Sequence, residues 1–157
     1  AGGDSKKISN IIHDSRLGTY GVSTLIIAII MRILLISSLV ETGFWLFFLM
    51  GASLAVGKGF IMINRRIFPV SEFAGPATIS FLGNNGRQIV CFLIWFLPCF
   101  FIFTLPQLAS GITLGLLISL WCGFRAKLYI GGVTGDVLGA TAFLAELAFL
   151  LGILILV

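Results

Sequence analysis

Charged residues are scarce in this sequence. They make up 10% of its 157 residues, whereas 59% are hydrophobic. A soluble domain carries about a quarter charged residues, because water must wet its surface. No charge occurs between Gln88 and Phe124, a stretch long enough for two membrane crossings of about 20 residues each. This scarcity excludes a water-soluble fold and indicates an integral membrane protein without a separate soluble domain.

The sequence also lacks the cysteine and histidine spacings of a metal or disulfide site. Cys91, Cys99 and Cys122 fall inside apolar runs with no Cys-x-x-Cys or Cys/His partner. His13 has no second ligand at a suitable spacing. The net charge of +4 is weak evidence for nucleic acid, because all but two of the basic residues flank apolar runs. We therefore expect no nucleic-acid partner.

Five long apolar segments are present instead. Polar residues do not alternate along them, as a membrane β-barrel would require, whereas helices satisfy their own backbone hydrogen bonds in lipid. The pattern predicts an all-α, polytopic helical bundle with about five transmembrane helices in one membrane domain, 1–157. The predicted spans cover about 20–40, 43–63, 88–105, 108–124 and 137–157.

Basic residues occur in alternate connections between these spans. The N-terminal segment, 64–87 and 125–136 contain Lys and Arg, whereas the links near Glu41 and Pro106 contain none. Basic loops are retained on the cytoplasmic side of a membrane. We therefore expect a cytoplasmic N-terminus, three cytoplasmic polar segments and a C-terminus outside.

Two glycine-flanked polar motifs lie next to spans. In the first, Asp14 and Arg16 are followed by Gly18, and the guanidinium could hold a phosphate that the backbone approaches at the glycine. The alternative is a solvated segment with Arg16 near lipid headgroups. In the second, Gly135 and Asp136 open the last span. A helix start binds anions and a carboxylate there can hold Mg²⁺, but Thr134 or Asp136 could equally cap the helix.

Arg32 and Glu146 lie inside the apolar runs. Arg32 is about twelve residues into the first span and Glu146 about ten into the fifth, so both reach a similar depth at 1.5 Å per residue. An unpaired charge there costs about 2.5–3.5 kcal/mol. We hypothesise an Arg32–Glu146 ion pair; the alternative is that each finds backbone or water separately. Lys58 lies nearer the inner face, where it could snorkel or join Arg65 in a site.

Small residues recur at a spacing of four within the spans. Gly111 and Gly115 form one G-x-x-x-G pair, and Gly135 and Gly139 form another. Such pairs allow helices to approach closely in lipid. Close packing is the preferred interpretation, except for the second pair, which overlaps the motif at Asp136.

Taken together, these motifs resemble the cobalamin synthase family, the adenosylcobinamide-GDP ribazoletransferases. The resemblance rests on DSRLGTYG at 14–21, GRQ at 86–88 and GVTGDVLGA at 132–140, with Glu146 ten residues after Asp136. It extends in order over nearly the whole chain. It implies a prokaryotic inner-membrane enzyme that uses Mg²⁺ in the last steps of cobalamin assembly, and it leaves a homo-oligomer open.

The resemblance also implies substrates and residue roles. The substrates are a nucleotide-activated corrinoid, adenosylcobinamide-GDP, and α-ribazole, which are joined with release of GMP. Arg16 would bind the pyrophosphate, Asp14 would orient it or a metal-bound water, and Asp136 would be a metal ligand. Weaker phosphate-binding candidates are Lys58, Arg65 and Arg87.

The sequence departs from the family pattern in two places. The family's acidic motif before Asp-Ser-Arg would stand upstream of Ala1, so we expect a fragment that is inactive without it. Phe143 occupies a position where the family often has Glu. Two other functions stay open: a small transporter that uses Arg32 and Glu146 at the midplane, and a structural membrane subunit whose 64–87 loop binds a partner.

Overall fold

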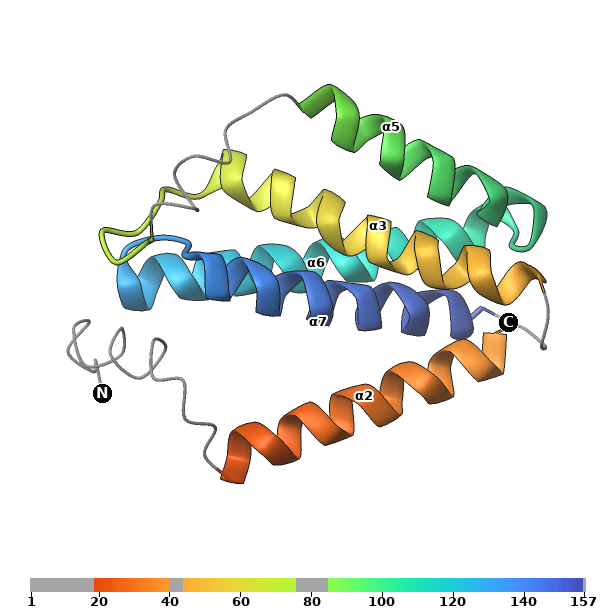
Figure 1. Ribbon diagram of the computed structural model, residues 1–157, viewed down its shortest axis with the longest axis horizontal. Coiled ribbons are helices and arrows are strands. Elements are labelled where there is room, and N and C mark those ends of the chain that lie inside the picture. Colours follow the sequence, from red (N-terminus) through yellow and green to blue (C-terminus); the bar gives the residue numbers. More distant parts are fainter. Residues whose placement is uncertain (1–18, 40–43, 76–84, 157) are drawn as a thin grey trace.

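A computed structural model describes residues 19–39, 44–75 and 85–156, and these residues form five α-helices (Figure 1). Within these ranges no strand is formed, and the one β-type pairing is an isolated parallel bridge between Val70 and Val133. The helices are α2 (Thr19–Leu39), α3 (Phe44–Ile67), α5 (Asn85–Phe96), α6 (Leu105–Ile130) and α7 (Gly135–Leu154), with a 3₁₀ helix η1 (Leu97–Phe101) after α5.

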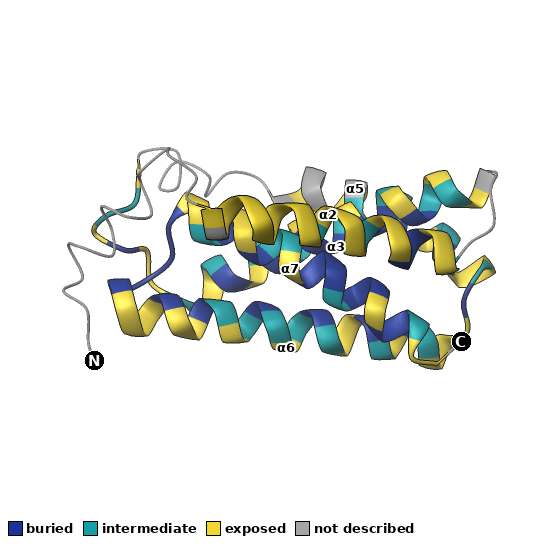
Figure 2. Ribbon diagram, turned by 90° about the horizontal axis from the view of Figure 1, so that it is seen from below, coloured by how far each residue is buried: buried dark blue, intermediate teal, exposed yellow. Residues whose placement is uncertain are grey.

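Four of the described helices are long and apolar enough to cross a membrane. They contain the stretches Gly21–Leu39, Trp45–Ile67, Leu105–Ile130 and Gly135–Leu154, and a shorter apolar stretch covers Phe92–Phe101. Large hydrophobic side chains are exposed along α2 in particular (Figure 2), as expected for a surface that lipid covers. The predicted all-α polytopic bundle is therefore confirmed.

The helices that cover the predicted third and fourth spans have different bounds from those spans. A continuous α-helix over 88–105 does not form, because Pro98 has no N–H and its ring clashes with the carbonyl four residues earlier. The chain continues there as η1. The fourth helix runs past the predicted end at 124 as far as Ile130. Arg125 and Lys127 are good helix formers and favour the negative C-terminal end of a helix, so they continue it.

The polar connections gather at one end of the bundle. α2, α5 and α7 begin there, and α3 and α6 end there (Figure 1). The described connections at this end are 68–75 and 131–134. We call it the polar end, and it agrees with the arrangement that the charge pattern predicted.

α7 is the central helix of the bundle. It packs against α6, α3 and α2, and half of the residues in its apolar stretch are buried (Figure 2). Phe149, Leu150 and Ile153 are fully buried in one core with Leu49 of α3 and Leu108 of α6. α7 therefore connects α2, α3 and α6, whereas α5 packs against α3.

α6 and α7 are closest where two glycines meet. A Cβ added to Gly152 would lie 2.6 Å from the Cα of Gly111, and a Cβ added to Gly111 would lie 2.7 Å from the carbonyl oxygen of Phe149. Gly111 therefore has the packing role predicted for it. Gly139 differs, because a Cβ there would have no atom within 4 Å.

Gly152→Ala is expected to destabilise the bundle by about 1–3 kcal/mol, because the new methyl group would push apart two helix backbones. Gly139→Ala in the same helix is the matched control. It should be neutral or stabilise by up to about 1 kcal/mol, since alanine is the better helix former. Unfolding of both variants in detergent micelles, followed by circular dichroism, measures the difference. Equal stability of the two would contradict the close crossing.

Candidate functional site

Two connections are joined by hydrogen bonds at the polar end. The Ser71 N–H donates to the Val133 carbonyl at 3.1 Å, and the Val133 N–H donates to the Pro69 carbonyl at 2.9 Å. The buried Ser71 hydroxyl donates to the Ile130 carbonyl at 2.6 Å. We call segments 68–75 and 130–134, held together in this way, the strap. It fixes the end of α3 against the start of α7.

Glycine makes this close approach possible. A Cβ added to Gly132 would lie 2.3 Å from the Pro69 carbonyl oxygen and 2.7 Å from the Ser71 nitrogen. Gly131, at the end of α6, has φ +75°, a left-handed conformation that glycine adopts without strain. The pair of glycines before Val133 thus allows both the turn and the contact.

The start of α7 is capped by Thr134. Its Oγ1 accepts a hydrogen bond from the Val137 N–H at 3.4 Å, and the residue is 1% exposed. Of the two capping residues that the sequence allowed, Thr134 caps the helix in the structure. Asp136 lies in the first turn and is exposed, where the positive end of the helix dipole favours a carboxylate.

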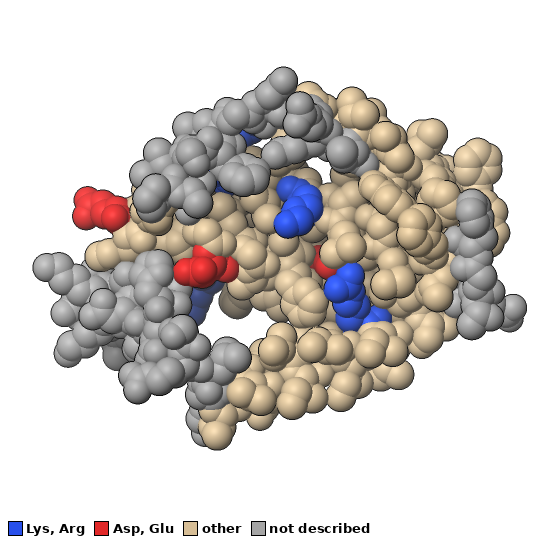
Figure 3. Space-filling model, in the orientation of Figure 1, with Lys and Arg blue, Asp and Glu red and all other residues tan. Residues whose placement is uncertain are grey.

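Basic side chains lie at the same end. Arg65 and Arg66 are in the last turn of α3, and Lys127 is in the last turn of α6. Lys58 is exposed on α3, about two turns before Arg65. In Figure 3 the basic and acidic groups of the described residues lie over the polar end and the middle of this face. The polar end therefore combines a carboxylate with several cations.

The structure describes only part of the predicted site. Asp14, Arg16 and Gly18 lie outside the described residues. Arg87 is in the first turn of α5, at the polar end, but its side chain also lies outside the description. Among the predicted residues that the structure does place at this end are Arg65 from α3 and Gly135 and Asp136 from α7.

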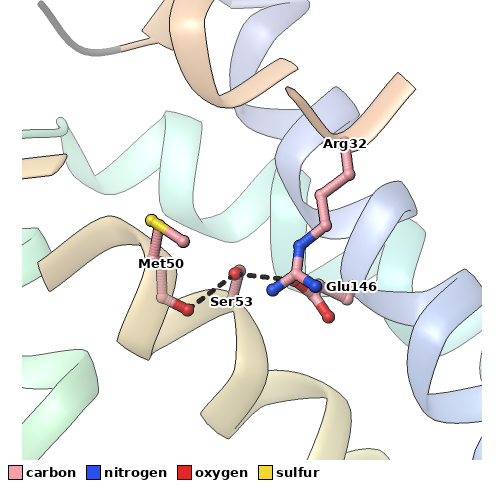
Figure 4. Close-up of polar contacts among 4 residues, drawn as sticks. All are labelled: Arg32, Met50, Ser53 and Glu146. Atoms are coloured by element: carbon pink, nitrogen blue, oxygen red, sulfur yellow. Dashed lines mark hydrogen bonds and ion pairs between the residues drawn. The ribbon is translucent and has the colours of Figure 1, made fainter. Parts of the chain in front are cut away.

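Arg32 and Glu146 form an ion pair in the middle of the bundle. Arg32 Nη2 of α2 lies 2.8 Å from Glu146 Oε1 of α7, and the two side chains are 25% and 4% exposed. The Ser53 hydroxyl of α3 lies 2.9 Å from the same Glu146 oxygen and 3.0 Å from the Met50 carbonyl (Figure 4). The pairing hypothesised from depth is thus present, and Ser53 connects it to a third helix.

A second buried polar contact, which the sequence did not predict, joins α3 to α6. Asn64 Nδ2 donates to the carbonyl and the hydroxyl of Ser119, at 3.2 and 2.5 Å, and connects α3 to α6. Its Oδ1 is buried, and a Cβ added to Gly123 would lie 2.4 Å from that oxygen. The available signals were a serine in the middle of the predicted second span, Ser53, and a polar residue directly after that span, Asn64.

The described residues include one exposed carboxylate at the start of α7 that can be compared with the needs of Mg²⁺. No group of three or more His, Cys, Asp and Glu side chains forms within the described ranges. Mg²⁺ is often held by one or two carboxylates together with substrate phosphates, and Asp136 is one exposed carboxylate of that kind. The chemistry of Asp136 fits such a role as a single ligand.

Comparison with known proteins identifies relatives of this chain. The sequence model of the Cobalamin-5-phosphate synthase family matches residues 1–154. The chain is 32% identical to the adenosylcobinamide-GDP ribazoletransferase of Shigella boydii serotype 4, and 31% identical to those of Shigella dysenteriae serotype 1 and Escherichia coli K12. Each match covers 94% of this chain.

The chain spans about 60% of the length of these curated relatives. No solved structure matches it significantly. Since the family match covers nearly all of the sequence, the resemblance seen in the motifs is confirmed, and this chain belongs to the cobalamin-5-phosphate synthase family.

Proposed function

We propose that this chain, in a protein of its relatives' length, catalyses the joining of adenosylcobinamide-GDP and α-ribazole. The family match over residues 1–154 carries this proposal. It is supported by the polar end, where the strap holds the start of α7, with Asp136, against the end of α3, with Arg65. We assign the Arg32–Glu146 pair to holding the helices together, because it joins α2 to α7 and the Ser53 hydroxyl joins it to α3.

The reaction is a phosphoryl transfer. A ribose hydroxyl of α-ribazole would attack the phosphorus that carries the cobinamide, the bond from that phosphorus to the GMP oxygen would break, and GMP would leave. Such a transfer depends on holding the reacting groups in line and neutralising phosphate charge. Basic side chains at the polar end are suited to neutralising the phosphate charge.

Each predicted site residue would have one of three roles: binding phosphate, allowing the substrate to approach the backbone, or holding Mg²⁺. Arg16 would bind the pyrophosphate, with Lys58, Arg65 and Arg87 as further phosphate contacts. Gly18 and Gly135 would let the backbone approach the substrate. Asp14 and Asp136 would hold Mg²⁺, which when bound neutralises charge on the phosphates.

The proposal includes a membrane orientation. The polar end would face the cytoplasm of a bacterial cell, where nucleotide substrates are found, and the end of α7 would face outward across the inner membrane. The basic residues in the last turns of α3 and α6 support this orientation. A homo-oligomer stays a prediction.

Asp136→Ala and Arg16→Ala, each in the full-length protein, are expected to abolish coenzyme formation. The reason is that each variant would lose a group on the phosphates or the metal, a kind of loss that typically costs a factor of about 100–1,000. Product formed from adenosylcobinamide-GDP and α-ribazole by reconstituted protein is the measurement. Membrane insertion, checked by carbonate extraction, should be unchanged, because Asp136 is exposed at a helix start. Near-normal activity in both variants would refute the assignment.

A further inference from the structure

We propose that the outer face of α6 at the polar end binds the phosphate of an anionic phospholipid through Arg125. The Arg125 guanidinium lies over two aromatic rings of its own helix, 4.7 Å from the centre of the Tyr129 ring and 5.8 Å from that of Trp121. Both distances are within the range of a cation–π contact. The cation is therefore held in place before any ligand arrives.

Arg125 keeps its hydrogen-bonding capacity for a ligand. Within the part of the chain that the structure describes, it has no acidic partner. Stacking on rings leaves the N–H groups in the plane of the guanidinium directed outward, and their fork matches two phosphate oxygens. The site thus offers a positioned cation of the geometry that phosphate requires.

The length of α6 places this site at the membrane boundary. Its 26 residues extend about 39 Å, whereas the hydrocarbon core is about 30 Å thick. Measured from Leu105, Arg125 lies about 30 Å along the helix, at the level of the far headgroups. Trp121 then lies just inside the hydrocarbon and Tyr129 just beyond it, the depths at which these residues are enriched.

The neighbouring side chains identify lipid as the source of the phosphate. Trp121 is 58% exposed and Tyr129 40% exposed. Phe124 and Leu128 beside them are also exposed, at 54% and 61%. A soluble phosphate would leave this apolar surface in water, whereas a phospholipid covers it with acyl chains and presents its phosphate to Arg125.

Lipid retention by the full-length protein tests the proposal. Native mass spectrometry would measure how much phosphatidylglycerol and phosphatidylcholine stay bound to the detergent-purified protein. Arg125→Gln is expected to retain about fivefold less phosphatidylglycerol than the parent, because it removes the positioned guanidinium whose N–H groups bind the lipid phosphate. Tyr129→Leu should retain about twofold less, because one of the two rings that hold the cation is gone.

Matched variants on the same helix serve as controls. Lys127→Gln removes an exposed cation from the same turn, and Phe124→Leu removes an exposed ring that is not one of the two rings under the Arg125 guanidinium. Both should retain phosphatidylglycerol as the parent does. All four variants should melt at the parent's temperature, because each changes an exposed side chain.

Three results would overturn the proposal. Equal loss of phosphatidylglycerol from the Arg125→Gln and Lys127→Gln variants would indicate diffuse positive charge instead of a site. Equal retention of phosphatidylglycerol and phosphatidylcholine by the parent would remove the preference for anionic lipid. Displacement of phosphatidylglycerol by added inorganic phosphate would show a soluble-anion site.

Discussion

Glu146→Ala is expected to destabilise the bundle by about 3 kcal/mol, because it leaves the Arg32 guanidinium without its counter-charge in an apolar environment. Arg32→Ala should cost a similar amount, since it leaves the nearly fully buried Glu146 carboxylate unpaired. Unfolding by sodium dodecyl sulfate in mixed micelles measures both. Ser53→Ala removes one hydrogen bond from the same carboxylate and should cost about 1 kcal/mol.

A double-mutant cycle separates the ion pair from the two residues taken singly. Exchanging the charges, Arg32→Glu with Glu146→Arg, should recover a large part of the stability that either single reversal loses. The recovery will be incomplete, because Ser53 is placed to donate to a carboxylate on α7 and not on α2. An exchange variant as unstable as the single reversals would show that the two charges act independently.

Gly132→Ala is expected to lower activity of the full-length protein by about a hundredfold. Its methyl group would overlap the Pro69 carbonyl and separate the two segments of the strap. A displacement of about 1 Å in a site can cost that factor. The free energy of unfolding should fall by only about 1–3 kcal/mol, as for an overpacked contact. Turnover and chemical unfolding of the same preparation measure the two effects.

Gly75→Ala is the matched control for this substitution. Gly75 lies in the same strap, and a Cβ there would have no atom within 4 Å. Its variant should keep both turnover and stability. Equal losses of turnover in the two variants would mean that the strap is sensitive to any change of sequence, and that the contact at Gly132 has no particular role in holding the start of α7.

The features of the fold that depend on burial of apolar surface could be predicted from the sequence. Length and apolarity alone indicated the spans, and the charges of the connections indicated which of them share an end. The Arg32–Glu146 pair could also be predicted, because residue count along a helix gives depth. The depth of a residue depends only on its position along a helix, and the side of a connection depends on its charges. Both can therefore be read directly from the sequence.

Other features depend on which face of a helix meets which neighbour. The partners of Asn64 and Ser53 could not be predicted, since they are decided by helix rotation and crossing. The end of α6 is a further example, because charge alone does not distinguish a loop from a helix that extends past the hydrocarbon. The Arg125 guanidinium lies over the Tyr129 ring of the same helix, which continues to Ile130. The break at Pro98 follows from the proline itself, although the residues around it are uniformly apolar.

The central position of α7 has a consequence for how the protein is made. A ribosome produces α2, α3 and α6 before α7, so those three helices enter the membrane before the helix that packs against each of them exists. Ser53 is synthesised 93 residues before the carboxylate to which it donates, and Arg32 earlier still. Until Glu146 arrives, the arginine must be tolerated by the insertion machinery or by a chaperone. Biogenesis of the whole bundle therefore depends on the completion of α7.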